Sequence, residues 1–143
     1  MEDPIDGGDA VRTAVRELHE ELGVGPERVH IVGRLPELKQ NLNRFVIAPV
    51  VGVLDPGTRF LVDGGEIAGV FSVPLASIVS SGAIYEDAEA GAARGRAMYA
   101  FDHDGRHIWG FTGRVLKAFA DAWAAPESPL RAAVRALIPS SED

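Results

Sequence analysis

The sequence predicts an α/β fold of the α+β sandwich type, in which helices flank a mixed sheet. Helical periodicity comes first along the chain, several β-branched runs follow it, and a second helical pattern comes after them. Strands and helices do not alternate regularly, as they do in a doubly wound parallel sheet. The chain has 143 residues and is 46% hydrophobic, which suits one domain with a real core and is too short for two. We therefore expect a single domain over residues 1–143.

The first expected element is a helix over residues 9–22. Four aliphatic residues recur there at steps of four, three and four, which places them on one buried face: Val11, Val15, Leu18 and Leu22. Asp9 is a typical N-cap residue, and Gly23 suits the left-handed conformation that ends many helices.

Strands are expected next, because the runs that follow are rich in β-branched residues and bounded by proline and glycine. These runs predict strands at about 29–34 and 45–54. Pro49 lies inside the second run and indicates a bulge or a sheet edge, since proline cannot donate to a ladder. Two more short strands are expected at 58–62 and 67–73, separated by an Asp-Gly-Gly turn.

The second half of the chain predicts a short helix, a loop, a hairpin and two longer helices. The short helix begins at a proline and covers 74–81. Small residues over 86–97 can bury little surface, so a mobile surface loop is expected there. Alternating runs over 96–111, joined by Asp-Gly, predict a hairpin. Apolar residues at helical spacing predict helices over 112–124 and 129–138.

Charge and composition narrow the classes of partner. A net charge of −7 argues against nucleic acid or an anionic membrane, and the absence of cysteine excludes disulfides, thiolate metal sites and cysteine nucleophiles. No apolar run approaches the roughly 20 residues that span a bilayer, and the first residues do not resemble a signal peptide. We therefore expect a cytoplasmic protein whose partner is a metal ion or a small molecule.

Three carboxylates lie close together near the end of the first expected helix. Glu17, Glu20 and Glu21 fall within about 100° of one another on a helical wheel. Carboxylates in a last turn face the negative end of the helix dipole, at a cost of roughly 0.3–1 kcal/mol each. Mg²⁺ and Mn²⁺ prefer such hard oxygen ligands and would remove that cost. A solvated helix surface and a metal site both remain open on this argument alone.

The stretch "RELHEELGV", residues 16–24, resembles the second half of the Nudix box, R-E-U-x-E-E-x-G-U, where U is aliphatic. The resemblance implies a hydrolase that cleaves a pyrophosphate joining a nucleoside to another moiety, with Mg²⁺ or Mn²⁺ as cofactor. It makes Glu17, Glu20 and Glu21 the metal ligands, and makes Glu20, Glu21 and Arg16 the catalytic residues. One of the glutamates would activate water, and Arg16 would orient the glutamates and the preceding loop.

Beyond the box, four stretches resemble the coenzyme A pyrophosphatase branch of the Nudix family: "LPEL", "PVVG", "VFSVPL" and "IWG". This branch cleaves coenzyme A (CoA) or acyl-CoA into adenosine 3′,5′-bisphosphate and 4′-phosphopantetheine. Two alternatives remain: a Nudix hydrolase of another nucleoside diphosphate derivative such as ADP-ribose, and a catalytically inactive Nudix-like binding module. The resemblance assigns no substrate-binding residue.

The chain also departs from the Nudix pattern near its start. The first half of the box would place a glutamate at position 8, where this sequence has Gly8. The strands that precede the box in the family are missing, so we expect a Nudix-like fold without its N-terminal strands. The apolar face of the helix over 9–22 would then be partly uncovered, and a homodimer could cover it.

Other polar and aromatic residues give weaker indications of a ligand. Arg94 and Arg96 could meet phosphates, although two arginines in a loop are more often solvated. Trp109, Phe111 and Tyr99 could stack on an adenine, although hairpin aromatics more often belong to a core.

Overall fold

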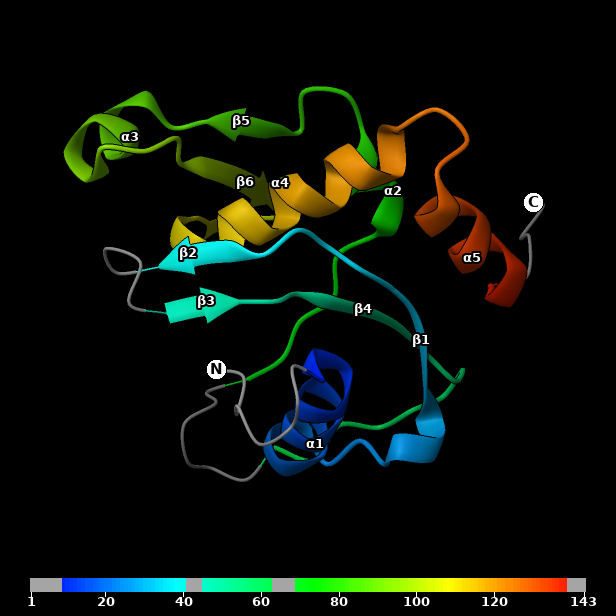
Figure 1. Cartoon of the computed structure of the whole chain (residues 1–143). Helices are drawn as coiled ribbons and strands as arrows, with labels where there is room; N and C mark the ends of the chain where they lie inside the picture. Colours follow the sequence, from blue (N-terminus) through cyan, green and yellow to red (C-terminus); the bar gives the residue numbers. More distant parts are fainter. Residues whose placement is uncertain (1–8, 41–44, 63–68, 139–143) are drawn as a thin grey trace. The chain divides into compact units, whose positions relative to one another are not determined.

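The computed structural model describes residues 9–40, 45–62 and 69–138, and it confirms a mixed α/β fold (Figure 1). The helices are α1 (Ala10–Leu22), the 3-10 helix η2 (Pro26–Arg28), α2 (Leu75–Val79), α3 (Ala88–Arg94), α4 (Gly110–Ala124) and α5 (Pro129–Leu137). The strands are β1 (Val29–Arg34), β2 (Leu38–Gln40), β3 (Phe45–Ile47), β4 (Val50–Leu54), β5 (Ile84–Glu86), β6 (Tyr99–His103) and β7 (Arg106–Ile108). The described strands pair antiparallel in three small sheets. The chain forms two compact units, one of residues 1–71 with 129–143 and one of residues 72–128.

The caps of α1 confirm the expected helix ends. The side chain of Asp9 accepts a hydrogen bond from the backbone N–H of Arg12 at 2.9 Å, as an N-cap residue does. Gly23 has φ 71°, and its N–H donates to the carbonyl of His19. A Cβ on Gly23 would lie 2.7 Å from the Cβ of Leu61, so both the backbone conformation and the neighbour favour glycine.

The buried side of α1 differs from the expected one. Ala10 and Thr13 are its buried residues, whereas the expected stripe is only half-buried: Val11, Val15, Leu18 and Leu22. At 100° per residue, Ala10 and Thr13 lie on the same face as Glu17. The face that carries the glutamates is therefore packed at its N-terminal end and exposed at its C-terminal end.

The sheets of the first unit explain why a proline is tolerated at position 49. β1 pairs with β4, with a register shift between Ile31 and Gly33, and β2 pairs with β3. The single strand expected at 45–54 is two strands, interrupted at Ala48 and Pro49. The carbonyl of Pro49 still accepts a hydrogen bond from the N–H of Leu35 at 3.0 Å. Proline therefore ends one strand without leaving its own carbonyl unsatisfied.

Helix α5, which was expected at 129–138, lies against β1. Its Leu130 and Val134 are buried, and a Cβ on Gly33 would be 3.6 Å from the side chain of Leu130. Leu35 and Val24 complete the buried apolar set of this unit together with Ala10. Val24 is 1% exposed, which explains why an aliphatic residue suits this position of the box.

Two expected strands are wrong as far as the structure describes them. Residues 58–62 and 69–73 carry no strand, and 67–68 lie outside the described residues. The N–H of Leu61 donates instead to the carbonyl of Leu22 at 2.7 Å. The segment therefore satisfies a free carbonyl at the C-terminal end of α1. In a strand, the same backbone N–H would have paired with a neighbouring strand.

The second unit is built on the sheet β5-β6-β7, with α4 packed against β6. The predicted hairpin is confirmed, with Asp104 at φ 53° and Gly105 at φ 79° in the turn. A Cβ on Gly113 would lie 2.0 Å from the carbonyl oxygen of Tyr99, so glycine permits this close approach of helix to strand. The core consists of Met98, Ala100 and Phe101.

The mobile loop expected at 86–97 is wrong, because α3 occupies most of it. Asp87 caps this helix by accepting from the N–H of Ala90 at 3.1 Å, and Gly95 ends it with φ 69°. Alanine is the best helix former, so a cap at each end is enough to order a short segment whose side chains bury little. Among the described residues, no helix is long and apolar enough to cross a membrane.

Candidate active site

The three glutamates of the box lie on α1 in different environments. Glu17 is half-buried, whereas Glu20 and Glu21 are exposed. Water screens the two exposed carboxylates from each other and from the helix dipole. The electrostatic cost expected from the sequence is therefore reduced before any cation binds.

Arg16 contacts one of these glutamates directly. Its Nε lies 3.9 Å from Oε2 of Glu20, one turn further along the helix. Both side chains are about half exposed, 47% and 62%, so the pair adds little stability. The guanidinium lies beside Glu20, and the orienting role expected for Arg16 stays a prediction.

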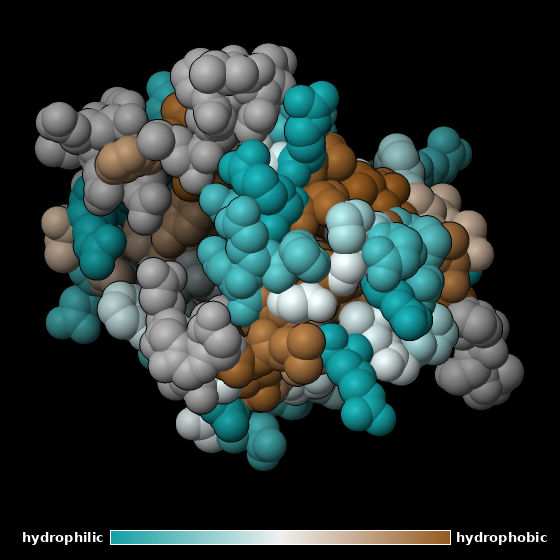
Figure 2. Space-filling model, turned by 90° about the horizontal axis from the view of Figure 1, so that it is seen from below, coloured by the Kyte–Doolittle hydropathy of each residue, from teal (hydrophilic) through white to brown (hydrophobic). Residues whose placement is uncertain are grey.

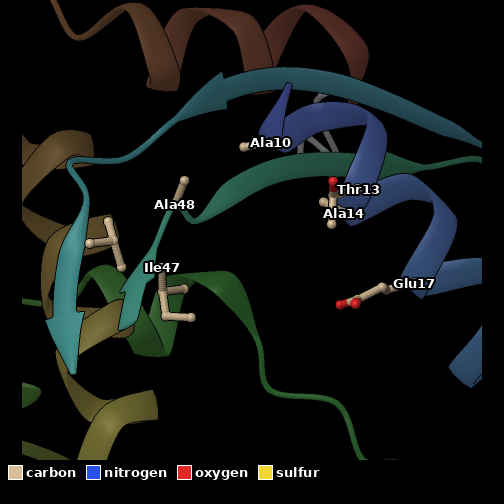
Figure 3. Close-up of a pocket in the computed structure, with 7 residues that line it drawn as sticks. Ala10, Thr13, Ala14, Glu17, Ile47 and Ala48 are labelled. Carbon is tan, nitrogen blue, oxygen red and sulfur yellow. The ribbon is translucent and has the colours of Figure 1, made fainter. Parts of the chain in front are cut away.

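A small pocket lies between α1 and β3, with Glu17 at its edge (Figure 3). Its volume is about 110 Å³, and its other lining residues are Ala10, Thr13, Ala14, Val46, Ile47 and Ala48. Figure 3 shows the carboxylate of Glu17 directed into the space between the helix and Ile47. The alanines leave this space open because they carry only a methyl group.

Thr13 is a site residue that the sequence did not indicate. It is buried, it lines the pocket, and it lies four residues before Glu17 on the same face of α1. Its spacing from Glu17 was visible in the sequence. Its place opposite β3 in the pocket was not, because no local pattern placed β3 there.

The donor chemistry of the glutamates suits a divalent cation, although the described side chains do not form a complete cage. No group of three or more His, Cys, Asp or Glu residues within 9–40, 45–62 and 69–138 is arranged to hold a metal ion. Mg²⁺ commonly binds through one or two carboxylates together with water and substrate phosphates. One or two of these carboxylates would be enough for a cation that arrives with a pyrophosphate, and the set Glu17, Glu20 and Glu21 stays a prediction.

Comparison with known proteins identifies the family. A NUDIX domain profile matches residues 4–95. The chain belongs to the Nudix family. The uncharacterized Nudix hydrolase NudL of Pectobacterium atrosepticum is 32% identical over 111 residues, which cover 77% of this chain and 57% of that protein. The uncharacterized NudL proteins of Citrobacter koseri and Salmonella paratyphi B are 26% identical over 118 residues, which cover 81% of this chain and 61% of each relative.

This Nudix chain therefore spans about 57–61% of the length of these curated relatives. The matched profile includes the whole of residues 16–24. The three glutamates on α1 lie within the matched region, and their assignment as the glutamates of the Nudix box stays a prediction.

The remaining candidates of this Nudix chain fall into two groups. Gly8 lies outside the described residues. In the second unit Trp109 is 56% exposed, whereas the rings of Phe111 and Tyr99 are each covered by a cation, Arg114 and Lys117 respectively. Adenine stacking on these aromatics stays a prediction, and Trp109 has the most accessible ring of the three.

Proposed function

We propose that this Nudix protein is a metal-dependent hydrolase of the pyrophosphate bond of CoA or acyl-CoA. The products would be adenosine 3′,5′-bisphosphate and 4′-phosphopantetheine. The observation that carries the proposal is the glutamate set on α1, with Glu17 directed into the pocket beside the helix. The four stretches that resemble the CoA pyrophosphatase branch support the choice of substrate.

Glu17, Glu20 and Glu21 would hold Mg²⁺ or Mn²⁺. When bound, the cation neutralises charge on the pyrophosphate and lowers the pKa of a water molecule. Arg16 would position the carboxylate of Glu20, and their separation of 3.9 Å supports this role. An exposed carboxylate, of Glu20 or Glu21, is free of packing constraints and can accept a proton from the attacking water.

The reaction is tested by incubating the protein with CoA and Mn²⁺ and separating the products. We expect 3′,5′-ADP and 4′-phosphopantetheine, with kcat reduced by about two to three powers of ten in Glu20→Gln or Glu21→Gln. Glu27→Gln is the matched control, because Glu27 is an exposed glutamate on η2. Cleavage of ADP-ribose with CoA untouched would indicate another Nudix substrate, and no turnover of either would favour a binding module.

We also propose that two copies associate through an apolar groove beside α1. The groove has a volume of about 370 Å³, and its lining includes Val15, Leu18, Leu22, Ile31, Leu54 and Phe60. Figure 2 views the molecule from the side of α1 and shows exposed hydrophobic surface between hydrophilic side chains. Among the described residues the β1-β4 sheet has only two strands. The same second copy could therefore extend this sheet and cover the groove.

A further inference from the structure

The pocket between α1 and β3 combines a carboxylate with a largely aliphatic lining. Five of its seven lining residues have purely aliphatic side chains: Ala10, Ala14, Val46, Ile47 and Ala48. The other two are Thr13 and Glu17, both on α1. Figure 3 shows the carboxylate of Glu17 facing the same space as the side chain of Ile47. A ligand in this pocket therefore meets a negative charge on one side and methyl groups on the other.

One face of α1 forms the helical side of the pocket. Ala10, Ala14 and Glu17 follow one another at steps of four and three, so they lie along the same face of the helix. Ala10 is buried. The helix therefore presents two methyl groups and then a carboxylate to the pocket.

Backbone pairing holds the opposite wall in place. Val46 pairs with Lys39 and Ile47 pairs with Leu38, so β3 is fixed to β2. Ala48 comes next, and the carbonyl of the following Pro49 accepts a hydrogen bond from the N–H of Leu35 at 3.0 Å. Ile47 and Ala48 are both half-buried. The wall is thus ordered by its backbone, while its side chains keep some accessible surface.

The size and chemistry of the pocket suit a compact alkyl group. Its volume is about 110 Å³. An enclosed apolar cavity of about 150 Å³ accommodates benzene, so this pocket suits a group of about four heavy atoms. Phosphate or hydroxyl oxygens against the aliphatic wall would lose hydrogen bonds to water without replacing them. Because Glu17 opens on the same space, the alkyl group has to lie next to the charged part of the ligand.

CoA carries such a group on one side of its pyrophosphate. In its pantoyl unit, a carbon atom with two methyl groups is separated from the phosphate by one oxygen and one methylene group. On the other side of the pyrophosphate is a ribose, and ADP-ribose has a ribose on both sides. A ribose would place hydroxyl groups against the aliphatic wall, where they would lack partners. The pantoyl unit therefore fits the pocket better than either ribose.

We propose that the pocket beside Glu17 binds the two methyl groups of the pantoyl unit, with Ile47 and Ala48 as the contacting wall. This subsite rests on the proposed function and adds two features to it. It places the pantetheine half of CoA between α1 and β3. It also gives the chain a physical reason to prefer CoA to ADP-ribose, because only CoA has a branched alkyl group at this position.

The binding test uses the full 143-residue chain with Mg²⁺ and 4′-phosphopantetheine, which contains no pyrophosphate to be cleaved. The comparison ligand is the same compound with hydrogen atoms in place of the two methyl groups. Calorimetry should show roughly tenfold tighter binding of the methylated compound, from the burial of two methyl groups. In Ala48→Leu, which fills part of the pocket, the ratio of the two affinities should fall to about one. Ala132→Leu on the exposed side of α5 is the matched control and should keep the ratio.

A second measurement on the unmodified protein does not depend on how well Ala48→Leu folds. Nuclear Overhauser contacts are recorded between the two methyl groups of bound 4′-phosphopantetheine and the methyl groups of the protein. We expect contacts to Ile47 and Ala48, which line the pocket. Equal affinity for the two ligands would overturn the proposal. No binding of either ligand would also overturn it, as would contacts only to methyl groups outside the pocket.

Turnover separates this subsite from the proposed function. A protein that hydrolyses CoA but binds both ligands equally would keep the proposed function and contradict the subsite. A protein that prefers the methylated ligand, with contacts to Ile47 and Ala48, but does not hydrolyse CoA would contradict the proposed hydrolysis and not the subsite. If both hold, Ala48→Leu should lower kcat/KM for CoA about tenfold more than it lowers kcat/KM for ADP-ribose.

Discussion

Asp102 on β6 and His107 on β7 face each other across the hairpin, with Oδ1 of Asp102 2.5 Å from Nδ1 of His107. Oδ2 of Asp102 accepts a hydrogen bond from the hydroxyl of Tyr85 on β5, also at 2.5 Å. One carboxylate thus links all three strands of the sheet. Two hydrogen bonds lower the pKa of Asp102, of which the bond from Tyr85 has the larger effect and the bond from His107 the smaller. The bond between Tyr85 and Asp102 also raises the pKa of Tyr85.

This arrangement predicts acid sensitivity of the second unit. Because the pKa of Asp102 is lower in the folded protein than in the unfolded chain, its ionised form adds stability at pH values above the unfolded pKa. That contribution is lost as the pH falls through the folded pKa. As the pH decreases from about 4, we expect the free energy of unfolding to decrease. The decrease should be less steep in Asp102→Asn.

The relative effects of the two hydrogen bonds on the pKa of Asp102 can be measured by carboxyl ¹³C NMR titration. Tyr85→Phe should raise the pKa of Asp102 more than His107→Gln does, because the bond from Tyr85 is the larger cause of the shift. A larger effect of His107→Gln, or none from either, would contradict this account.

Metal binding should begin at the box glutamates. On titration with Mn²⁺, we expect paramagnetic broadening of NMR signals to appear first in α1, around Glu17, Glu20 and Glu21. Replacing all three by glutamine should abolish it, since an amide oxygen carries no charge. The control replaces an unrelated exposed acid, Glu89→Gln on α3. Unchanged broadening of α1 in the triple variant would show that the ion binds elsewhere.

The pocket beside Glu17 should be needed for substrate and not for folding. Ala48→Leu would fill part of its 110 Å³ from the β3 side. We expect KM for CoA to rise about tenfold, as contacts near the substrate are lost, with Tm nearly unchanged because the added side chain enters open space. Ala132→Leu on the exposed side of α5 is the matched control. Equal KM values in the two variants would exclude this pocket from the substrate site.

The close crossing of α4 and β6 should tolerate no added methyl group. Gly113→Ala places a Cβ 2.0 Å from the carbonyl oxygen of Tyr99, a backbone atom that cannot move away cheaply. We expect the free energy of unfolding in urea to fall by about 1–3 kcal/mol. Thr112→Ala, at the exposed neighbouring position, should change it by about 0.5 kcal/mol or less. A Gly113→Ala protein as stable as the control would mean that helix and strand separate easily.

Local signals in the sequence predicted several elements correctly. The ends of α1 follow from Asp9 and Gly23 alone, and the hairpin follows from Asp104 and Gly105, because caps and tight turns depend on residues next to one another. α3 was missed although Asp87 and Gly95 carry the same kind of signal. A composition of small residues favours a mobile loop, but such residues also form short capped helices.

Which side chains of α1 are buried depends on tertiary packing and could not be predicted from the sequence. A helical wheel places Glu17 with Glu20 and Glu21. In the structure Glu17 is half-buried and lines a pocket together with residues of β3, whereas the other two are exposed. The same wheel made Val15 and Leu18 look buried. They line a groove instead, because the elements described around them leave that side of α1 open.

The groove predicts concentration-dependent association. Ile31 and Phe60 line it and remain 37% and 39% exposed. Full burial of such side chains is worth roughly 1.5–3 kcal/mol each, so a few of them are a large part of a typical stability of about 5–15 kcal/mol. A twofold contact would bury each of these residues twice, once in each copy. We therefore expect light scattering to show a dimer whose fraction rises with protein concentration.

Phe60→Lys should weaken the dimer, because a lysine at the groove would bring two like charges into the contact. Trp109→Lys is the control, since Trp109 is a larger exposed aromatic, 56% exposed, that belongs to the second unit. Both variants replace a partly exposed ring, so the control accounts for the general loss of apolar surface. A monomer at every concentration, or equal weakening by both substitutions, would show that the groove does not join two copies. In the second case the contact surface would have to include the second unit.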